Sequence, residues 1–190
     1  MRVLSTAIAS ILATKYEIDA AGIEAFVGGF VFGLIQKDDL PEIQKCLKNA
    51  SSLEAEVTNA ISDLSKGDVA DIIKAVEEMG QIVKELPADL ADCQGMTDDI
   101  AKIENWAKIF AHPTTLIETI TKNLLANWST IFGDVSKVES DWTAASYYNA
   151  GDDVADILVL TVGKPTETAE IESYDWTYLQ STLKENMSLF

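Results

Sequence analysis

Apolar residues recur along most of the chain with the spacing of an α-helix. From Leu53 to Leu64 they follow one another at four, three, one and three residues, and a longer stripe runs from Val69 to Leu86. A helix has 3.6 residues per turn, so this spacing places the side chains on one face and predicts amphipathic helices. Similar stripes follow at 100–110, 116–131, 135–145 and 154–162.

Local signals predict where these helices begin and end. Ser51 and Glu54 have the spacing of a capping box, and Asp68 precedes the longest stripe as an N-cap residue. Pro87 is expected to close that helix, because proline disrupts a helix interior. Further helix starts are expected at Thr97, Pro113, Gly133–Asp134 and Gly151–Asp152.

The segment from Ile18 to Ile35 reads as an apolar helix that contains glycines. Gly29 and Gly33 are four residues apart, so a second helix is expected to approach closely on that side. Pairing inside a membrane is the alternative. The uncharged part, Ala25 to Ile35, covers only about half of a bilayer core, which favours a buried helix over a membrane span.

These patterns predict an all-α fold, a compact bundle of short helices in one domain over residues 1–165. The first 14 residues read either as a signal-like segment, with Arg2 before an apolar run, or as an N-terminal helix. After Pro165 the pattern changes to a partial polar–apolar alternation. We call residues 166–190 the C-terminal arm and expect it to be extended or partly helical.

The net charge is −17, from 31 acidic and 14 basic residues. A surface this negative repels phosphate backbones and anionic lipids, so nucleic acids are not expected partners. We interpret the negative charge as a feature that keeps the protein soluble; binding of divalent cations or of a counter-charged partner is the alternative. No segment matches an EF-hand loop.

Cys46 and Cys93 both follow a Leu-Pro pair and an aliphatic residue, in what we expect to be short helices. We predict a disulfide that closes a loop of nearly fifty residues, worth roughly 4 kcal/mol in the chain-entropy treatment. Buried free thiols and a catalytic or metal-binding role are the alternatives.

The sequence offers no catalytic constellation. His112 is the lone histidine, and it stands at a helix junction without a nucleophile motif nearby. Acidic pairs such as Asp98–Asp99 fall at predicted helix starts, where they suit the helix dipole. No phosphate-binding loop or dinucleotide fingerprint occurs. We therefore predict no enzyme activity, no catalytic residue, no cofactor and no metal site.

Three Asn-x-Ser sequons, at Asn49, Asn127 and Asn186, are glycosylation candidates if the chain enters a secretory pathway. Together with the cysteine pair they favour a secreted or cell-surface protein. The tryptophans are expected in the core or at a subunit interface, with Trp128 partly exposed; stacking on sugars or flat pigments is the alternative. The arm supplies a candidate assembly surface, formed by Trp176, Tyr178, Leu179 and Phe190.

Several stretches together resemble a family of small secreted proteins that is abundant in ciliates. They are Ile103 to Pro113 (IENWAKIFAHP), Lys122 to Leu125 (KNLL), and Gly151 to Pro165, together with the two Leu-Pro…Cys pairs. The resemblance covers Ala25 to Pro165 and implies secretion, a helical fold and structural cysteines. The family has no assigned activity, so the resemblance implies no mechanism, and the arm is an addition to it.

Three functional hypotheses follow. The first is a non-enzymatic secreted or surface structural protein that assembles with itself through its terminal segments, the arm or residues 1–14. The second is a helical carrier that holds a lipid or pigment in an apolar pocket lined by Ala25 to Ile35. The third is an enzyme whose active site the sequence does not reveal.

Overall fold

A computed structural model describes residues 17–48 and 50–165, and these residues are helical without any strand. The predicted all-α fold is therefore confirmed. The α-helices are α2 (Ala20–Ile35), α3 (Leu40–Cys46), α4 (Glu54–Leu64), α5 (Val69–Asp89), α6 (Thr97–Ala107), α7 (Pro113–Ala126), α8 (Trp128–Thr143) and α9 (Tyr147–Val162). Short 3-10 turns occupy η1 (Ala50–Ser52), η2 (Gln94–Met96) and η3 (Lys108–Ala111).

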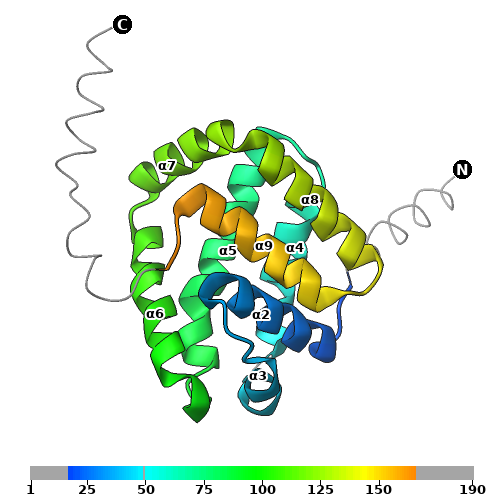
Figure 1. Cartoon of the computed structure of the whole chain (residues 1–190), viewed down its shortest axis with the longest axis vertical. Coiled ribbons are helices and arrows are strands. Elements are labelled where there is room, and N and C mark those ends of the chain that lie inside the picture. Colours follow the sequence, from blue (N-terminus) through cyan, green and yellow to red (C-terminus); the bar gives the residue numbers. More distant parts are fainter. Residues whose placement is uncertain (1–16, 49, 166–190) are drawn as a thin grey trace, which may run out of the picture.

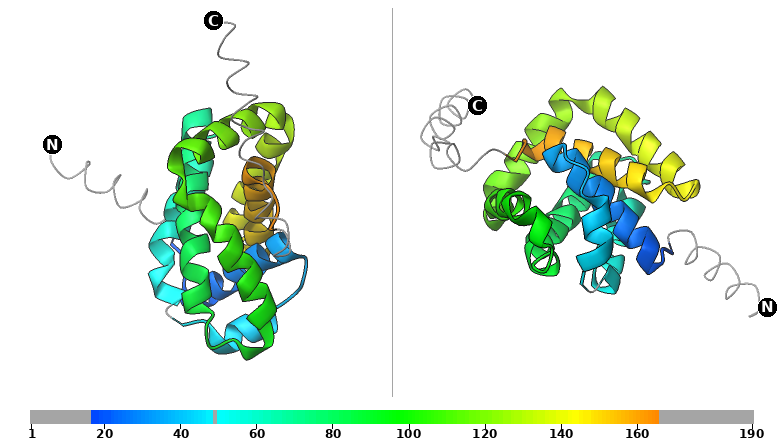
Figure 2. Two further views of the ribbon diagram at one scale, coloured as in Figure 1. Left: turned by 90° about the vertical axis from the view of Figure 1, so that its left-hand side faces the viewer. Right: turned by 60° about the horizontal axis from the view of Figure 1, so that its bottom comes forward.

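Helices α2 and α9 lie side by side although they are far apart in the sequence (Figure 1). The α8 helix packs along α9, and α4 packs along α5. The turned views in Figure 2 show that α4 and α5 lie behind the α2–α9 pair. The chain thus forms a helical bundle in which an early and a late helix share one interface.

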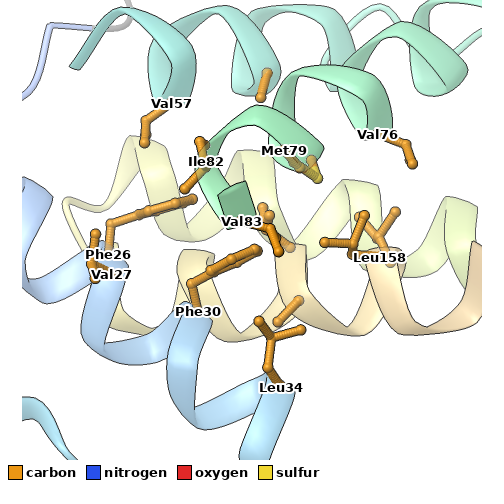
Figure 3. Packing of buried hydrophobic residues seen from close by; sticks show 14 of the residues in the cluster. Phe26, Val27, Phe30, Leu34, Val57, Val76, Met79, Ile82, Val83 and Leu158 are labelled. Carbon is orange, nitrogen blue, oxygen red and sulfur yellow. The ribbon is translucent and has the colours of Figure 1, made fainter. Parts of the chain in front are cut away.

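The core is centred on α5. Its buried side chains face Phe26 and Phe30 of α2, Val57 of α4 and Leu158 of α9 (Figure 3). Burying so much apolar surface is the main stabilising contribution to such a fold. The predicted stripe is confirmed at Ile72, Val76, Met79, Val83 and Leu86, but Val69 is 37% exposed, because it stands in the first turn of the helix.

Three glycines let α2 and α9 approach closely. A Cβ atom built on Gly29 would collide with the backbone carbonyl of Tyr148, and one on Gly151 would collide with that of Phe26. A Cβ on Gly33 would lie 2.5 Å from the Cβ of Ala155. The close approach predicted for Gly29 and Gly33 is therefore confirmed. The prediction that Gly151 opens the last helix was wrong, because this glycine lies inside α9 at the contact.

Two other expected helix breaks were also wrong. Helix α5 continues through Pro87 to Asp89, since a proline in the last turn removes only one backbone hydrogen bond. Helix α8 continues through Gly133, where Ile131 and Val135 on either side are both buried and hold the helix against the core.

Two expected caps differ as well. Ser51 lies in η1 and α4 begins at Glu54 without a side-chain cap, so no capping box forms. Thr97 is the first residue of α6, and its hydroxyl donates to the carbonyl of Gln94 instead of capping the helix. By contrast, the Asp68 carboxylate accepts a hydrogen bond from the Asp71 amide at 2.9 Å, as an N-cap residue does.

The Cys46–Cys93 disulfide is present, with the two Cα atoms 5.2 Å apart. It joins the end of α3 to the residue that precedes η2. The second cysteine does not lie in a short helix opened by Leu-Pro, because Leu86 and Pro87 belong to α5. The bridge therefore fixes α3 to the connection between α5 and α6.

Candidate assembly surface

The described residues leave an apolar surface exposed where α7 turns into α8. The exposed fractions are 64% for Leu125, 36% for Trp128 and 48% for Phe132. The rings of Trp128 and Phe132 lie 5.9 Å apart between centroids. We call these three residues the corner patch. Large apolar side chains gathered on a surface are typical of interaction sites.

The bend at Asn127 explains why these side chains face solvent. Helix α7 ends at Ala126 and α8 begins at Trp128, so a single helical face does not continue across the bend. The helical spacing predicts one buried stripe from Leu116 to Ile131. That was wrong at two positions: Ile117 is 40% exposed, and Ile131 belongs to α8.

The corner patch extends toward the start of α5. The ring of Phe132 is the nearest atom group to Gly67, at 3.6 Å from the position a Cβ would take there. Gly67 has a φ of 73°, a conformation that glycine adopts easily, and it allows the tight turn from α4 to α5. The exposed Val69 follows two residues later.

The last turn of α9 lies against α7, the helix that carries Leu125. The side-chain amide of Asn123 on α7 donates a 3.0 Å hydrogen bond to the carbonyl of Thr161, in the last turn of α9. Asn123 precedes Leu125 by two residues. The beginning of the described chain lies elsewhere: Ile18 and Tyr147 both contact the position of Gly22, at the far end of α8 from Trp128.

Apart from the corner patch, the described residues include buried aspartates that could not be expected from the acidic composition. Asp63, Asp99 and Asp134 are each at most 6% exposed, and each pairs with a lysine three residues later. The signal was present as three Asp-x-x-Lys segments, since this spacing brings two side chains together on a helix. The interpretation of the acidic residues as groups that favour solubility therefore does not hold at these positions.

Further lysines complete two of these clusters. Asp63 also binds Lys74 at 2.5 Å, and Asp99 binds Lys37 at 2.6 Å. Burial alone would raise the pKa of Asp63, but the hydrogen bonds from Lys66 and Lys74 lower it below its usual range. The pKa of Asp99 is lowered in the same way, by Lys37 and Lys102. Asp63 therefore links α4 to α5, and Asp99 links α6 to the connection between α2 and α3.

The acids of α9 behave in the opposite way. Burial raises the pKa of Asp153 to about 6, although Lys137 lies 3.9 Å from this carboxylate. The pKa values of Asp152 and Asp156 are also raised by burial. These acids are not part of a metal-binding cluster. Within the described residues, no group of three or more His, Cys, Asp or Glu is placed so that it could hold a metal ion.

Of the predicted site residues, the structure describes Asn127 and the disulfide pair. Asn49, Asn186 and the candidate assembly residues Trp176, Tyr178, Leu179 and Phe190 lie outside the described residues. His112 is exposed at the start of α7, and Cys93 is bound in the disulfide, so the two do not form a thiol–imidazole pair. Trp106 and Trp142 are buried as expected.

Two pockets of the described fold do not lie where the carrier hypothesis places its ligand. An enclosed pocket of about 10 Å³ lies between α4 and α8, with Ile61, Val138 and Trp142 in its wall. An open groove of about 570 Å³ lies between α5 and α6, with Pro87, Ile100 and Ala107 in its floor. Neither includes a residue of α2. Within the described part of the chain, no helix has the length and apolar character that crossing a membrane requires.

Comparison with known proteins gives one result. A family model described as SctB-like, secreted protein B-like, matches residues 6–161. This match supports the expected secretion, and its description names no reaction. Neither the curated proteins nor the solved structures contain a match.

Proposed function

Because this chain belongs to the SctB-like family of secreted proteins, we propose that it acts after secretion by assembling with copies of itself. In this proposal it is a structural protein without enzyme activity, and the C-terminal arm of one copy covers the corner patch of another. The observation that carries the proposal is the exposure of Leu125, Trp128 and Phe132 on a domain that buries nearly all its other large apolar residues.

The arm has the composition that such a surface would take up. It carries Trp176, Tyr178 and Leu179 within four residues, and Phe190 at the end. Aromatic residues are enriched at interfaces because they bury a large area with little loss of side-chain freedom. The apolar side chains of the arm and those of the patch would be removed from water together.

Reach supports the arm as the contacting segment. An extended chain spans about 3.3 Å per residue, so the eleven residues from Pro165 to Trp176 cover about 36 Å. Thr161 is held against Asn123, within one helical turn of Leu125. A segment of this length is long enough to contact a second molecule while the helical domain keeps its structure.

Charge makes this association sensitive to salt. Each copy carries a net charge of −17, so two copies repel one another. At about 0.15 M salt the screening length is about 8 Å, and it shortens as salt is added. We expect association to strengthen with rising salt, because screening weakens the repulsion while the apolar contact persists.

Sedimentation velocity over a range of concentrations tests the proposal. The full chain prepared without attached glycans should associate, and a chain ending at Pro165 should remain monomeric. A Phe132→Ser variant of the full chain should associate at least about tenfold more weakly, because an aromatic contact worth about 1.5 kcal/mol is lost.

Ile117→Ser is the matched control. Ile117 is an exposed apolar residue on the same helix as Leu125 but lies outside the corner patch. This variant should associate like the parent chain. A glycan-free full chain that stays monomeric at high concentration and high salt would refute self-assembly. Equal association of the Phe132 and Ile117 variants would refute the role of the patch.

A further inference from the structure

The sequon at Asn127 stands at the corner patch itself. Asn127 is the single residue between α7 and α8, and its backbone, at φ −112° and ψ 17°, ends the first helix. Its backbone amide and its side-chain amide both donate to the carbonyl of Asn123, each at 2.9 Å. The side chain is half-buried, and the two other sequon residues, Trp128 and Ser129, are exposed.

We propose that Asn127 is a site of N-linked glycosylation, and that the attached glycan regulates self-assembly by covering the corner patch. The proposal of regulation rests on the proposed function. The modification site rests on its own observations: the complete sequon, its position at a helix junction with Trp128 and Ser129 exposed, and the secreted family to which the chain belongs.

The geometry of the side-chain amide fits this modification. An asparagine amide has two N–H groups, and one of them suffices for the bond to the Asn123 carbonyl. The other can be replaced by a sugar without loss of that bond. The helix end would thus keep its side-chain hydrogen bond after modification, and the domain would not have to rearrange.

The chemistry is a group transfer from a lipid pyrophosphate-linked oligosaccharide, catalysed by the transferase of the secretory pathway. The Asn127 Nδ2 atom forms a bond to C1 of the first N-acetylglucosamine. The bond from C1 to the phosphate oxygen breaks, the lipid pyrophosphate leaves, and one amide proton passes to a base on the transferase.

A glycan at this position would shield the patch. Trp128 is the next residue, and its exposed indole offers an apolar face on which a sugar ring can stack. Leu125 and Phe132 lie two residues before and five residues after Asn127. The bulky, strongly hydrated sugar would keep the arm of another copy away from all three side chains.

Intact mass tests the site. The full chain is secreted from a eukaryotic host, and its mass is measured before and after treatment with peptide N-glycosidase. Asn127→Gln and Ser129→Ala should each lower the untreated mass by one glycan, since each destroys the sequon. Ile117→Ser should leave it unchanged. An Asn127→Gln protein with a glycan mass equal to that of the parent would overturn the site.

Sedimentation of the same proteins tests the regulation. The glycosylated parent should remain monomeric at concentrations where Asn127→Gln associates. If the glycan is present at Asn127 but both proteins associate equally, the regulatory role is overturned and the modification site stands. If neither associates at any concentration, the proposed function fails, whereas the mass result still decides the site.

Discussion

The α2–α9 interface and the α7–α8 corner are both rich in apolar side chains, and they differ in what lies against them. At the interface, glycines at 29, 33 and 151 let two helices approach until backbone meets backbone. At the corner, the bend at Asn127 leaves Leu125, Trp128 and Phe132 without a covering helix. Apolar character alone therefore does not define the core of this chain; burial requires a second element whose surface can approach.

The largest expected effect comes from adding a methyl group at the interface. Gly29→Ala should destabilise the fold by about 3 kcal/mol or more, because its Cβ would meet the Tyr148 carbonyl and the helices would have to separate. Chemical denaturation measures this loss. The control is Gly133→Ala, at a helical glycine with open space around it, which should be neutral or stabilise by about 0.5–1 kcal/mol.

If Gly29→Ala and Gly133→Ala proved equally stable, the glycines would not set the helix spacing. The same pair of variants also separates packing from helix propensity, because both replace glycine by alanine in a helix interior.

An intermediate effect concerns pH and the acids of α9. The folded-state pKa of Asp153 is about 6, above the usual value of about 3.9 in an unfolded chain. The unfolded state therefore ionises first, and stability is lost as pH rises from about 4 to about 6. We expect a loss of about 1 kcal/mol after allowing for solvent screening. The groups acting on Asp153 are Lys137, Asp134, Asp141 and Asp152.

Asp153→Asn should remove this decrease and stabilise the protein at pH 7, as measured by denaturant unfolding at several pH values. Asp63 and Asp99 act with the opposite sign. Their pKa values are lowered in the folded state, so their contribution is lost as the pH falls below about 4. A stability that rises steadily from pH 4 to pH 7 would contradict this assignment.

The smallest expected effect is that of corner-patch substitutions on the stability of one copy. Phe132→Ser should change the free energy of unfolding by no more than about 1 kcal/mol, since nearly half of this side chain is already in water. When the free energy of unfolding is measured in a chain ending at Pro165, the result reports the stability of the monomer alone. A loss of 2 kcal/mol or more would mean that Phe132 belongs to the core.

Features that repeat along a helix could be predicted from the sequence, whereas features that depend on the tertiary arrangement could not. Helical stripes, the Asp68 cap and the disulfide could be predicted because spacing and residue type determine them. Pro87 and Gly133 were misread as breaks, because packing of the neighbouring apolar residues maintains both helices. The exposure of Leu125 and Phe132 could not be predicted, since it depends on a bend that the continuous stripe conceals.

Part of the candidate site could be predicted from the sequence. The sequon at Asn127 and the partial exposure of Trp128 were predicted from residue types alone. The arm was singled out for its aromatic residues, which stays a prediction because residues 166–190 lie outside those described. The buried aspartates were missed although their Asp-x-x-Lys spacing was readable, because the excess of acidic residues suggested a solvated surface.

Cross-linking between isotope-labelled copies tests most directly whether the arm of one molecule covers the corner of another. Asn127→Gln protein is prepared with ¹⁴N and with ¹⁵N, and the two are mixed and treated with a lysine-reactive reagent. Lys122 is exposed three residues before Leu125, and Lys184 lies in the arm. We predict mixed-isotope peptides that join Lys122 to Lys184, and their loss with Phe132→Ser. Cross-links between these lysines within single copies only, or none at all, would contradict the account.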